Sequence, residues 1–215
     1  TAYPFAIQNT KDFNNLLRVY LDAVFFSRLD PLDFAQEGHR LEFEQPDDPK
    51  SDLVFKGVVF NEMKGAMSSV TSTLWQSLCH HLFPSNTYHY NSGGEPACIP
   101  DLSYTELRDF YTTHYHPSNS IFMTFGDIPA DTHQAVFEEH ALANFERLHE
   151  KIEVPLERRY SEPLRVQETY AFDDSGSADN KTHIVMAWLL GESSDLEAQL
   201  EAQLLSSVLL DNSAS

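Results

Sequence analysis

The 215-residue chain predicts a mixed fold of helices and strands, and two patterns in the sequence indicate it. Several long segments repeat apolar residues every three or four positions, which is typical of helices that pack on one face. Shorter segments alternate apolar and polar residues, which is typical of half-buried strands. Apolar residues form 41% of the chain and charged residues 22%, so the composition supports a packed core and argues against global disorder.

Helices are predicted where an apolar stripe begins at a residue that can cap it. Asn9 or Thr10 can cap the first stripe, and Ser103 with Glu106 forms a capping box before a later one. The stripe between residues 53 and 83 predicts one long helix, although two glycines weaken it. The predicted helices cover about 9–27, 53–83, 103–114 and 131–148 and a segment from 194 onward, with a short helical turn over 34–38.

Strands are predicted where alternation is short and turn-forming residues flank it. Tyr3, Phe5 and Ile7 alternate in this way at the start of the chain. The predicted strands cover 3–7, 40–44, 120–126, 164–172 and 182–190, and the predicted loops cover 45–52, 84–100 and 173–180.

The domain organisation follows from a change of composition near Lys151. Residues 151–163 are charged, contain two prolines and lack any period, so they are the expected linker. Residues 1–150 then form most of a first domain, and residues 164–215 form the beginning of a second. The chain opens on a predicted strand without an initiator Met and ends directly after a strongly apolar helix, and we therefore expect an excised piece of a longer protein.

The charge balance restricts the possible partners. Asp and Glu number 33 against 14 Lys and Arg, giving a formal net charge of −19. Such a chain repels phosphate backbones and anionic lipid, so neither nucleic acid nor a membrane is an expected partner, whereas a cationic peptide would be attracted. Two cysteines cannot form a disulfide framework, and no apolar run is long enough to span a membrane, which together favour a reduced, cytoplasmic setting.

The chain contains ten histidines, so their spacing is compared with the motifs of known zinc sites. Neither H-E-x-x-H nor H-x-x-E-H occurs in the chain. Cys79, His80, His81 and His89 lie near one another but match no closed zinc site, so a solvated helix end is the preferred interpretation. A ligand role is disfavoured still more for two other histidine pairs: His114 with His116, and His133 with His140, for which a partly exposed helix surface is preferred. Motifs for nucleophilic catalysis or phosphate binding are also missing.

One carboxylate stands out. Glu62 lies beside Val59 and Ala66, at the edge of the apolar stripe of the predicted long helix. An inward-facing carboxylate needs a cation, a donor or a metal, because removing its charge from water is costly. From the residues alone, a glutamate that reaches past the stripe to water remains the simpler alternative.

A family resemblance favours a ligand role for Glu62 over a side chain that only reaches water. The run Gly-Val-Val-Phe-Asn-Glu-Met-Lys-Gly over residues 57–65 resembles a signature of the pitrilysin and insulinase family of inverted-zincin metallopeptidases. The similarity is closest to the presequence protease branch, dense over residues 1–127 and thinner beyond. Further stretches fit that branch in the same order: residues 9–13, 20–26, 36–38, 86–88, 92–94 and 115–119.

The resemblance implies a zinc site. In that family two histidines and the general base come from an H-x-x-E-H helix, and a glutamate on a later helix completes the ligands; that glutamate corresponds to Glu62. The H-x-x-E-H segment is expected upstream of Thr1, so the resemblance implies one zinc ion per full-length enzyme. The 215 residues alone are then expected neither to hold zinc nor to be active.

The resemblance also implies a fold and a function. Members are built from α+β domains with helices on one face of an antiparallel sheet, paired around an unfolded peptide. The first domain would here be incomplete and the second truncated. The implied function is a zinc metalloendopeptidase that hydrolyses short unstructured peptides of the presequence type, in the mitochondrial matrix of a eukaryote, with the remainder of its own polypeptide as partner. The alternative is a non-catalytic structural subunit, although the presence of Glu62 favours the enzyme.

Overall fold

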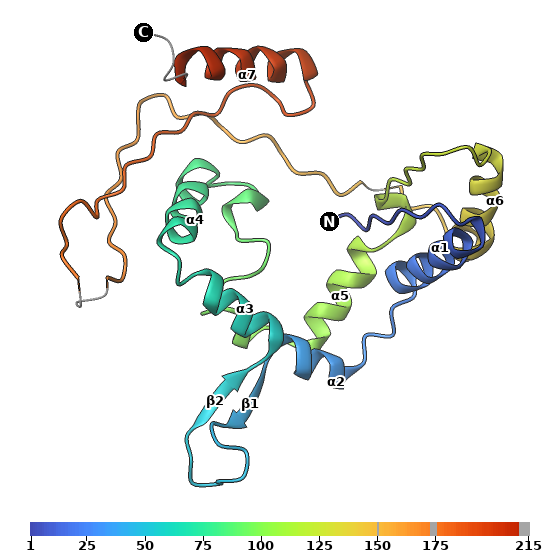
Figure 1. Cartoon of the computed structure of the whole chain (residues 1–215), viewed down its shortest axis with the longest axis horizontal. Coiled ribbons are helices and arrows are strands. Elements are labelled where there is room, and N and C mark those ends of the chain that lie inside the picture. Colours follow the sequence, from blue (N-terminus) through green and yellow to red (C-terminus); the bar gives the residue numbers. More distant parts are fainter. Residues whose placement is uncertain (150, 173–175, 211–215) are drawn as a thin grey trace. The chain divides into compact units, whose positions relative to one another are not determined.

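The computed structural model describes residues 1–149, 151–172 and 176–210 (Figure 1). Helices together with one antiparallel sheet confirm the α+β class. The chain divides into two compact units, residues 1–60 with 98–153 and residues 61–97 with 154–215. The elements, with η for 3-10 and π turns, are α1 (Thr10–Phe25), α2 (Pro31–Asp33), η1 (Phe34–Gly38), β1 (Arg40–Phe43), β2 (Leu53–Lys56), α3 (Val58–Ala66), α4 (Val70–Leu82), η2 (Thr87–His89), η3 (Ile99–Asp101), α5 (Tyr104–His114), η4 (Pro117–Asn119), α6 (Ala130–His140), η5 (Leu142–Asn144) and α7 (Leu196–Leu210).

The core of the first unit lies along α1. Leu17, Leu21 and Phe25 recur every four residues and are buried, which confirms the predicted apolar stripe. Ala141, just after α6, completes this buried cluster. The predicted cap is also confirmed, because the Asn9 side chain accepts hydrogen bonds from the backbone at the first turn of α1. Partly buried residues surround the cluster: Phe5, Phe13, Val24, Phe122, Val136, Phe137 and Phe145.

Helix α5 is tied to the end of α1 by a tyrosine. The hydroxyl of Tyr111 donates to the Val24 carbonyl at 2.8 Å and accepts from the Ser27 amide at 2.9 Å. One carbonyl at the C-terminal end of α1, that of Val24, thereby gains a side-chain partner. The capping box of Ser103 and Glu106 begins α5 as predicted.

The β1–β2 hairpin corrects the predicted long helix over 53–83. Leu53 pairs with Phe43 and Lys56 with Arg40 in an antiparallel register, so the first four residues of that segment form a strand. Pairing with β1 gives the backbone of Val54 and Phe55 sheet partners, and both residue types are favoured in strands. The helical remainder is further divided, because α3 ends at Ala66 and α4 begins at Val70.

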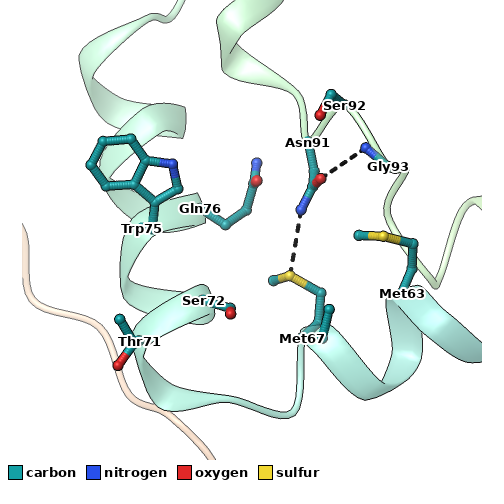
Figure 2. Close-up of a pocket in the computed structure, with 10 residues that line it drawn as sticks. Met63, Met67, Thr71, Ser72, Trp75, Gln76, Asn91, Ser92 and Gly93 are labelled. Atoms are coloured by element: carbon teal, nitrogen blue, oxygen red, sulfur yellow. Dashed lines mark hydrogen bonds between the residues drawn. The ribbon is translucent and has the colours of Figure 1, made fainter. Parts of the chain in front are cut away.

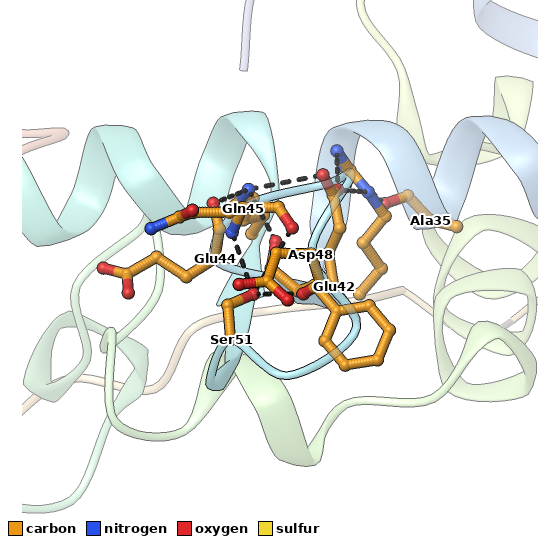
Figure 3. Close-up of polar contacts among 9 residues, drawn as sticks. Ala35, Glu42, Glu44, Gln45, Asp48 and Ser51 are labelled. Atoms are coloured by element: carbon orange, nitrogen blue, oxygen red, sulfur yellow. Dashed lines mark hydrogen bonds and ion pairs between the residues drawn. The ribbon is translucent and has the colours of Figure 1, made fainter.

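Charged side chains close the hairpin (Figure 3). Lys56 Nζ donates to Glu42 Oε1 at 3.3 Å and to the carbonyls of Phe43 and Glu44. Arg40 Nη2 lies 2.7 Å from Glu42 Oε2. The hydrogen bond from Lys56, followed by that from Arg40, holds the pKa of Glu42 below its ordinary range.

Strand pairing is narrower than predicted. Within the described ranges, β1 and β2 alone form a ladder, and the predicted strands over 3–7, 120–126, 164–172 and 182–190 have no sheet partner. Two side-chain hydrogen bonds nevertheless join the regions of these last two segments, from Tyr170 to the Lys181 carbonyl at 2.6 Å and from Arg159 to that of Leu190. The acidic loop expected over 173–180 lies partly outside the described residues.

The helix predicted from 194 onward is present as α7. Leu196, Leu200, Leu204 and Val208 form its stripe, but their exposed fractions range from 57% to 77%. The apolar pattern is therefore correct, while the described residues do not cover it.

Gly57 marks a close approach between two backbones. It is buried between β2 and α3, and a Cβ atom there would lie 2.7 Å from the Gly38 carbonyl carbon, 2.9 Å from His39 Cα and closer still to the Gly38 oxygen. A clash with backbone is not relieved by turning a side chain, so the junction would have to move.

We therefore expect Gly57→Ala to lower the free energy of unfolding by about 1–3 kcal/mol, as overpacked positions do. Gly65→Ala is the matched control, because no atom lies within 4 Å of a Cβ at that position. Alanine also favours helix, so this variant should match or exceed the wild-type stability. Denaturant unfolding of the purified variants measures both, and equal stability of the two would contradict the close approach.

Candidate functional site

Glu62 lies in the middle of α3, a helix of nine residues. Its side chain is exposed, and no described residue forms a hydrogen bond or an ion pair with it. The sequence left two positions open for this side chain, inward at the edge of the stripe or past it to water. The second agrees with the structure, since α3 buries none of its residues and Val59 is 38% exposed. The described residues cover the predicted stripe only in part, since Met63, Val70, Leu74 and Leu78 are half-buried, and the exposed carboxylate remains available to a ligand.

The C-terminal end of α3 is held by a compact turn. The Met67 amide donates to the Met63 carbonyl at 2.9 Å, and Ser68 Oγ donates to that of Gly65 at 2.6 Å. Thr73 Oγ1, in the first turn of α4, donates to the Met67 carbonyl at 3.2 Å. These bonds satisfy carbonyls that a helix end leaves without partners, and they join α3 to α4.

A pocket of about 520 Å³ lies between α3, α4 and the loop that follows η2 (Figure 2). Met63, Met67 and Trp75 give it an apolar wall, and Asn91 and Gln76 supply polar groups. Its remaining lining residues are Ala66, Thr71, Ser72, Ser92 and Gly93. The lining surface is mainly apolar, although five of the ten lining residues are Thr, Ser, Gln or Asn.

The pocket is next to Glu62 on the helix surface. Ala66 lines the pocket and is four residues after Glu62, and such residues share a face one turn apart. The arrangement thus combines an exposed carboxylate with a neighbouring apolar hollow. The sequence gives no signal for the pocket, because its lining comes from two separate segments, within 63–76 and 91–93.

A metal at Glu62 would need ligands beyond those in the structure. A catalytic zinc ion takes three protein ligands and leaves one position open. Among the described residues, no three His, Cys, Asp or Glu side chains gather in a way that could hold a metal ion. Glu62 can therefore supply one oxygen ligand from a regular helix, and the described residues do not complete a set of three ligands around it.

The histidines of the Cys79, His80, His81 and His89 cluster do come together, but they are engaged in other contacts. The rings of His80 and His89 lie 3.8 Å apart, and His81 Nε2 lies 2.8 Å from Glu168 Oε1. Burial raises the pKa of the Cys79 thiol, which disfavours the thiolate that binds metals.

The other histidines have local roles. The His116 side chain caps η4 by accepting from the Ser118 amide at 3.1 Å, and His114 stacks on Phe110. His133 was expected on a partly exposed helix face, but it is buried. Its ring packs against Phe13 at a centroid distance of 5.6 Å, because α6 faces the core of the first unit there.

Two glutamates attach the segment after residue 154 to the end of α4. Glu157 accepts from the amide and the hydroxyl of Ser85 at 2.8 and 2.7 Å. Glu168 accepts from Ser77 Oγ at 2.6 Å in addition to its contact with His81. The predicted linker over 151–163 is thus bonded to folded structure along part of its length.

Comparison with known proteins places these features in a wider context. A family model described as "Peptidase M16 inactive domain" matches residues 101–215. The chain is 47% identical over 212 residues to a protein of Xenopus tropicalis named "Presequence protease, mitochondrial", and 44% identical over 211 residues to the Mus musculus protein of that name; each alignment covers 98% of this chain. An Arabidopsis thaliana protein named "Presequence protease 1, chloroplastic/mitochondrial" is 39% identical over 220 residues, covering 100% of this chain.

The chain spans about a fifth of the length of these relatives: 21% of the Xenopus protein and 20% of the other two. Among the described residues, no helix has both the length and the apolar character needed to cross a membrane.

The Glu168 contact predicts an acid-sensitive attachment. The hydrogen bonds from Ser77 and then His81 hold the pKa of Glu168 below its ordinary range. A lowered carboxyl pKa stabilises the folded state above the ordinary pKa, and this contribution is lost as the pH falls through the folded-state pKa. Because the Glu168 side chain is 48% exposed, we expect Glu168→Gln to cost at most about 1 kcal/mol at neutral pH and nothing at acid pH.

Unfolding measured across the pH range tests this expectation. Glu162→Gln is the control, since Glu162 is an exposed glutamate of the same segment and no described residue bonds to its side chain. A loss of stability that is the same at every pH would show that the charge of Glu168 is not the cause.

Proposed function

The chain belongs to the peptidase M16 family, and from this premise we propose that it is part of a zinc metalloendopeptidase in which Glu62 is one zinc ligand. The observation that carries the proposal is the state of Glu62. Its carboxylate is exposed and without a partner among the described residues, on a helix whose C-terminal end is bonded to α4. A ligand must be held at a fixed orientation while remaining open to the metal. The bonds at the end of α3 support the first condition, and the exposed carboxylate supports the second.

The remaining parts of the site must come from other residues of the protein. We assign the two histidine ligands and the general base to an H-x-x-E-H segment outside these 215 residues, which do not contain that motif. Two neutral imidazoles and one carboxylate would leave a position for water, whose pKa a bound zinc ion lowers toward neutrality. By themselves the 215 residues are therefore inactive in this proposal.

The substrates in this proposal are short unstructured peptides of the presequence type. Two features of the chain support them. The net charge of −19 attracts basic peptides, and the apolar pocket beside Glu62 lies next to the proposed site of chemistry. The relatives carry the word mitochondrial in their names, which supports the mitochondrial matrix as the location.

The remainder of the same polypeptide is the proposed structural partner. The buried apolar residues are few, whereas large apolar side chains are exposed along α7 and along the segments over 164–172 and 182–190. Burial of such surface is the main favourable term in folding, so these faces need cover. We retain residues 1–150 and 164–215 as parts of two successive domains, with 151–163 between them.

A second candidate is a non-catalytic subunit of the same family. The description "inactive domain" of the matching family model favours it. That match covers residues 101–215, however, and Glu62 lies outside it. An H-x-x-E-H segment preceding this sequence in the whole protein would support the enzyme, and its loss would support the subunit.

The test is Glu62→Gln in the full-length protein. The amide keeps the size but removes the negative charge, so two neutral histidines would remain to hold a dication. We expect the zinc content after dialysis to fall and cleavage of a basic unstructured peptide to slow by at least ~100-fold. Thermal stability without zinc should change little.

Glu138→Gln is the matched control, because Glu138 is an exposed glutamate on α6 to which no described residue bonds. It should keep the wild-type zinc content and turnover. If Glu62→Gln behaved in the same way as this control, Glu62 would not be a ligand.

A further inference from the structure

The loop over 91–93 contacts α3 at two positions on one face. Met63 and Met67 are four residues apart, and both point toward this loop in the pocket (Figure 2). Met63 directly follows Glu62. We propose that Asn91 and Gly93 are positioning residues that brace α3 and thereby fix the orientation of Glu62; this inference rests on the proposed role of Glu62 as a zinc ligand.

Asn91 joins the loop to the helix. Its Oδ1 accepts from the Gly93 amide at 3.0 Å, which fixes the side-chain amide within its own loop. Its Nδ2 then donates to Met67 Sδ at 3.6 Å. A thioether is a weak acceptor, so this bond contributes orientation more than strength.

Gly93 permits the close approach at Met63. A Cβ atom at position 93 would lie 3.0 Å from Met63 Cε, closer still to Met63 Sδ, and 3.5 Å from Asn91 Oδ1. The methionine end is flexible and borders an open pocket, so an added methyl group would displace it and would not unfold the unit. The consequence of a side chain at 93 is therefore a lost contact between loop and helix.

The contact matters because α3 has little support of its own. A helix of nine residues is marginal in isolation, and α3 buries none of its side chains here. Its middle, where Glu62 lies, is held through the turn at its C-terminal end and through the two methionines. A metal ligand must stay within about 0.5 Å of its productive position, and a rocking helix would exceed that.

The test compares Gly93→Ala, Asn91→Ala and Gly65→Ala in the full-length protein. The readouts are the rate of zinc release to an excess of chelator, the visible spectrum of the cobalt-substituted protein, and the thermal stability. We expect the Gly93 and Asn91 variants to release zinc about 3- to 30-fold faster, which corresponds to roughly 0.7–2 kcal/mol, with an altered cobalt spectrum and a small change in stability. Gly65→Ala should match the wild type, because a Cβ there meets no atom within 4 Å.

A second arm asks whether Gly93 acts through Met63. Met63→Ala removes the atoms that a Cβ at position 93 would meet, so in that background Gly93→Ala should have almost no further effect on zinc release. A full additive effect would overturn the proposed route. Asn91→Ala adds no atoms, so it keeps the test valid if Gly93→Ala does not fold.

Glu62→Gln, measured in the same experiment, distinguishes the ligand role of Glu62 from the bracing role of Asn91 and Gly93. Faster zinc release in Glu62→Gln with wild-type release in both the Gly93 and Asn91 variants would overturn the brace and leave the ligand assignment intact. Wild-type release in Glu62→Gln would overturn the ligand assignment and the brace together.

Discussion

Helix α3 is too short to be stable by itself, and the candidate site depends on the contacts that hold it. At its start, Gly57 meets the backbone of Gly38 and His39 so closely that no side chain fits between them. At its end, Ser68 and Thr73 satisfy the carbonyls that the helix leaves open. The position of Glu62 thus depends on the contacts at the end of the helix and on those of Met63 and Met67, since no side chain of α3 is buried in a core.

Local signals were predictable from the sequence, and non-local ones were not. The Asn9 cap and the Ser103–Glu106 box depend on residues within one turn, and both were predicted correctly. The prediction of one long helix over 53–83 was wrong for two reasons. Residues 53–56 pair with β1, ten residues upstream of β2, and the turn before α4 divides the remaining helical part. The residues alone left two positions open for Glu62, and its exposure agrees with the simpler one, a side chain that reaches past the stripe to water.

The candidate site was likewise predictable from the sequence only in part. Glu62 was identified through a family resemblance, whereas its exposure and its neighbours required coordinates. In the sequence Met63 was an ordinary member of an apolar stripe, and Met67 lay outside that stripe. Only the fold shows that they border a pocket, and that Asn91, 24 residues after Met67, reaches one of them.

The two methionines give α3 a chemical vulnerability. Oxidation of a methionine turns a flexible apolar thioether into a polar, chiral sulfoxide. At Met67 the added oxygen would replace the weak sulfur acceptor that Asn91 now contacts, and at Met63 it would add bulk in the space that Gly93 leaves free. Oxidation of these methionines would thus change the contacts that hold α3 while leaving Glu62 chemically unmodified. A methionine sulfoxide reductase would reverse the oxidation.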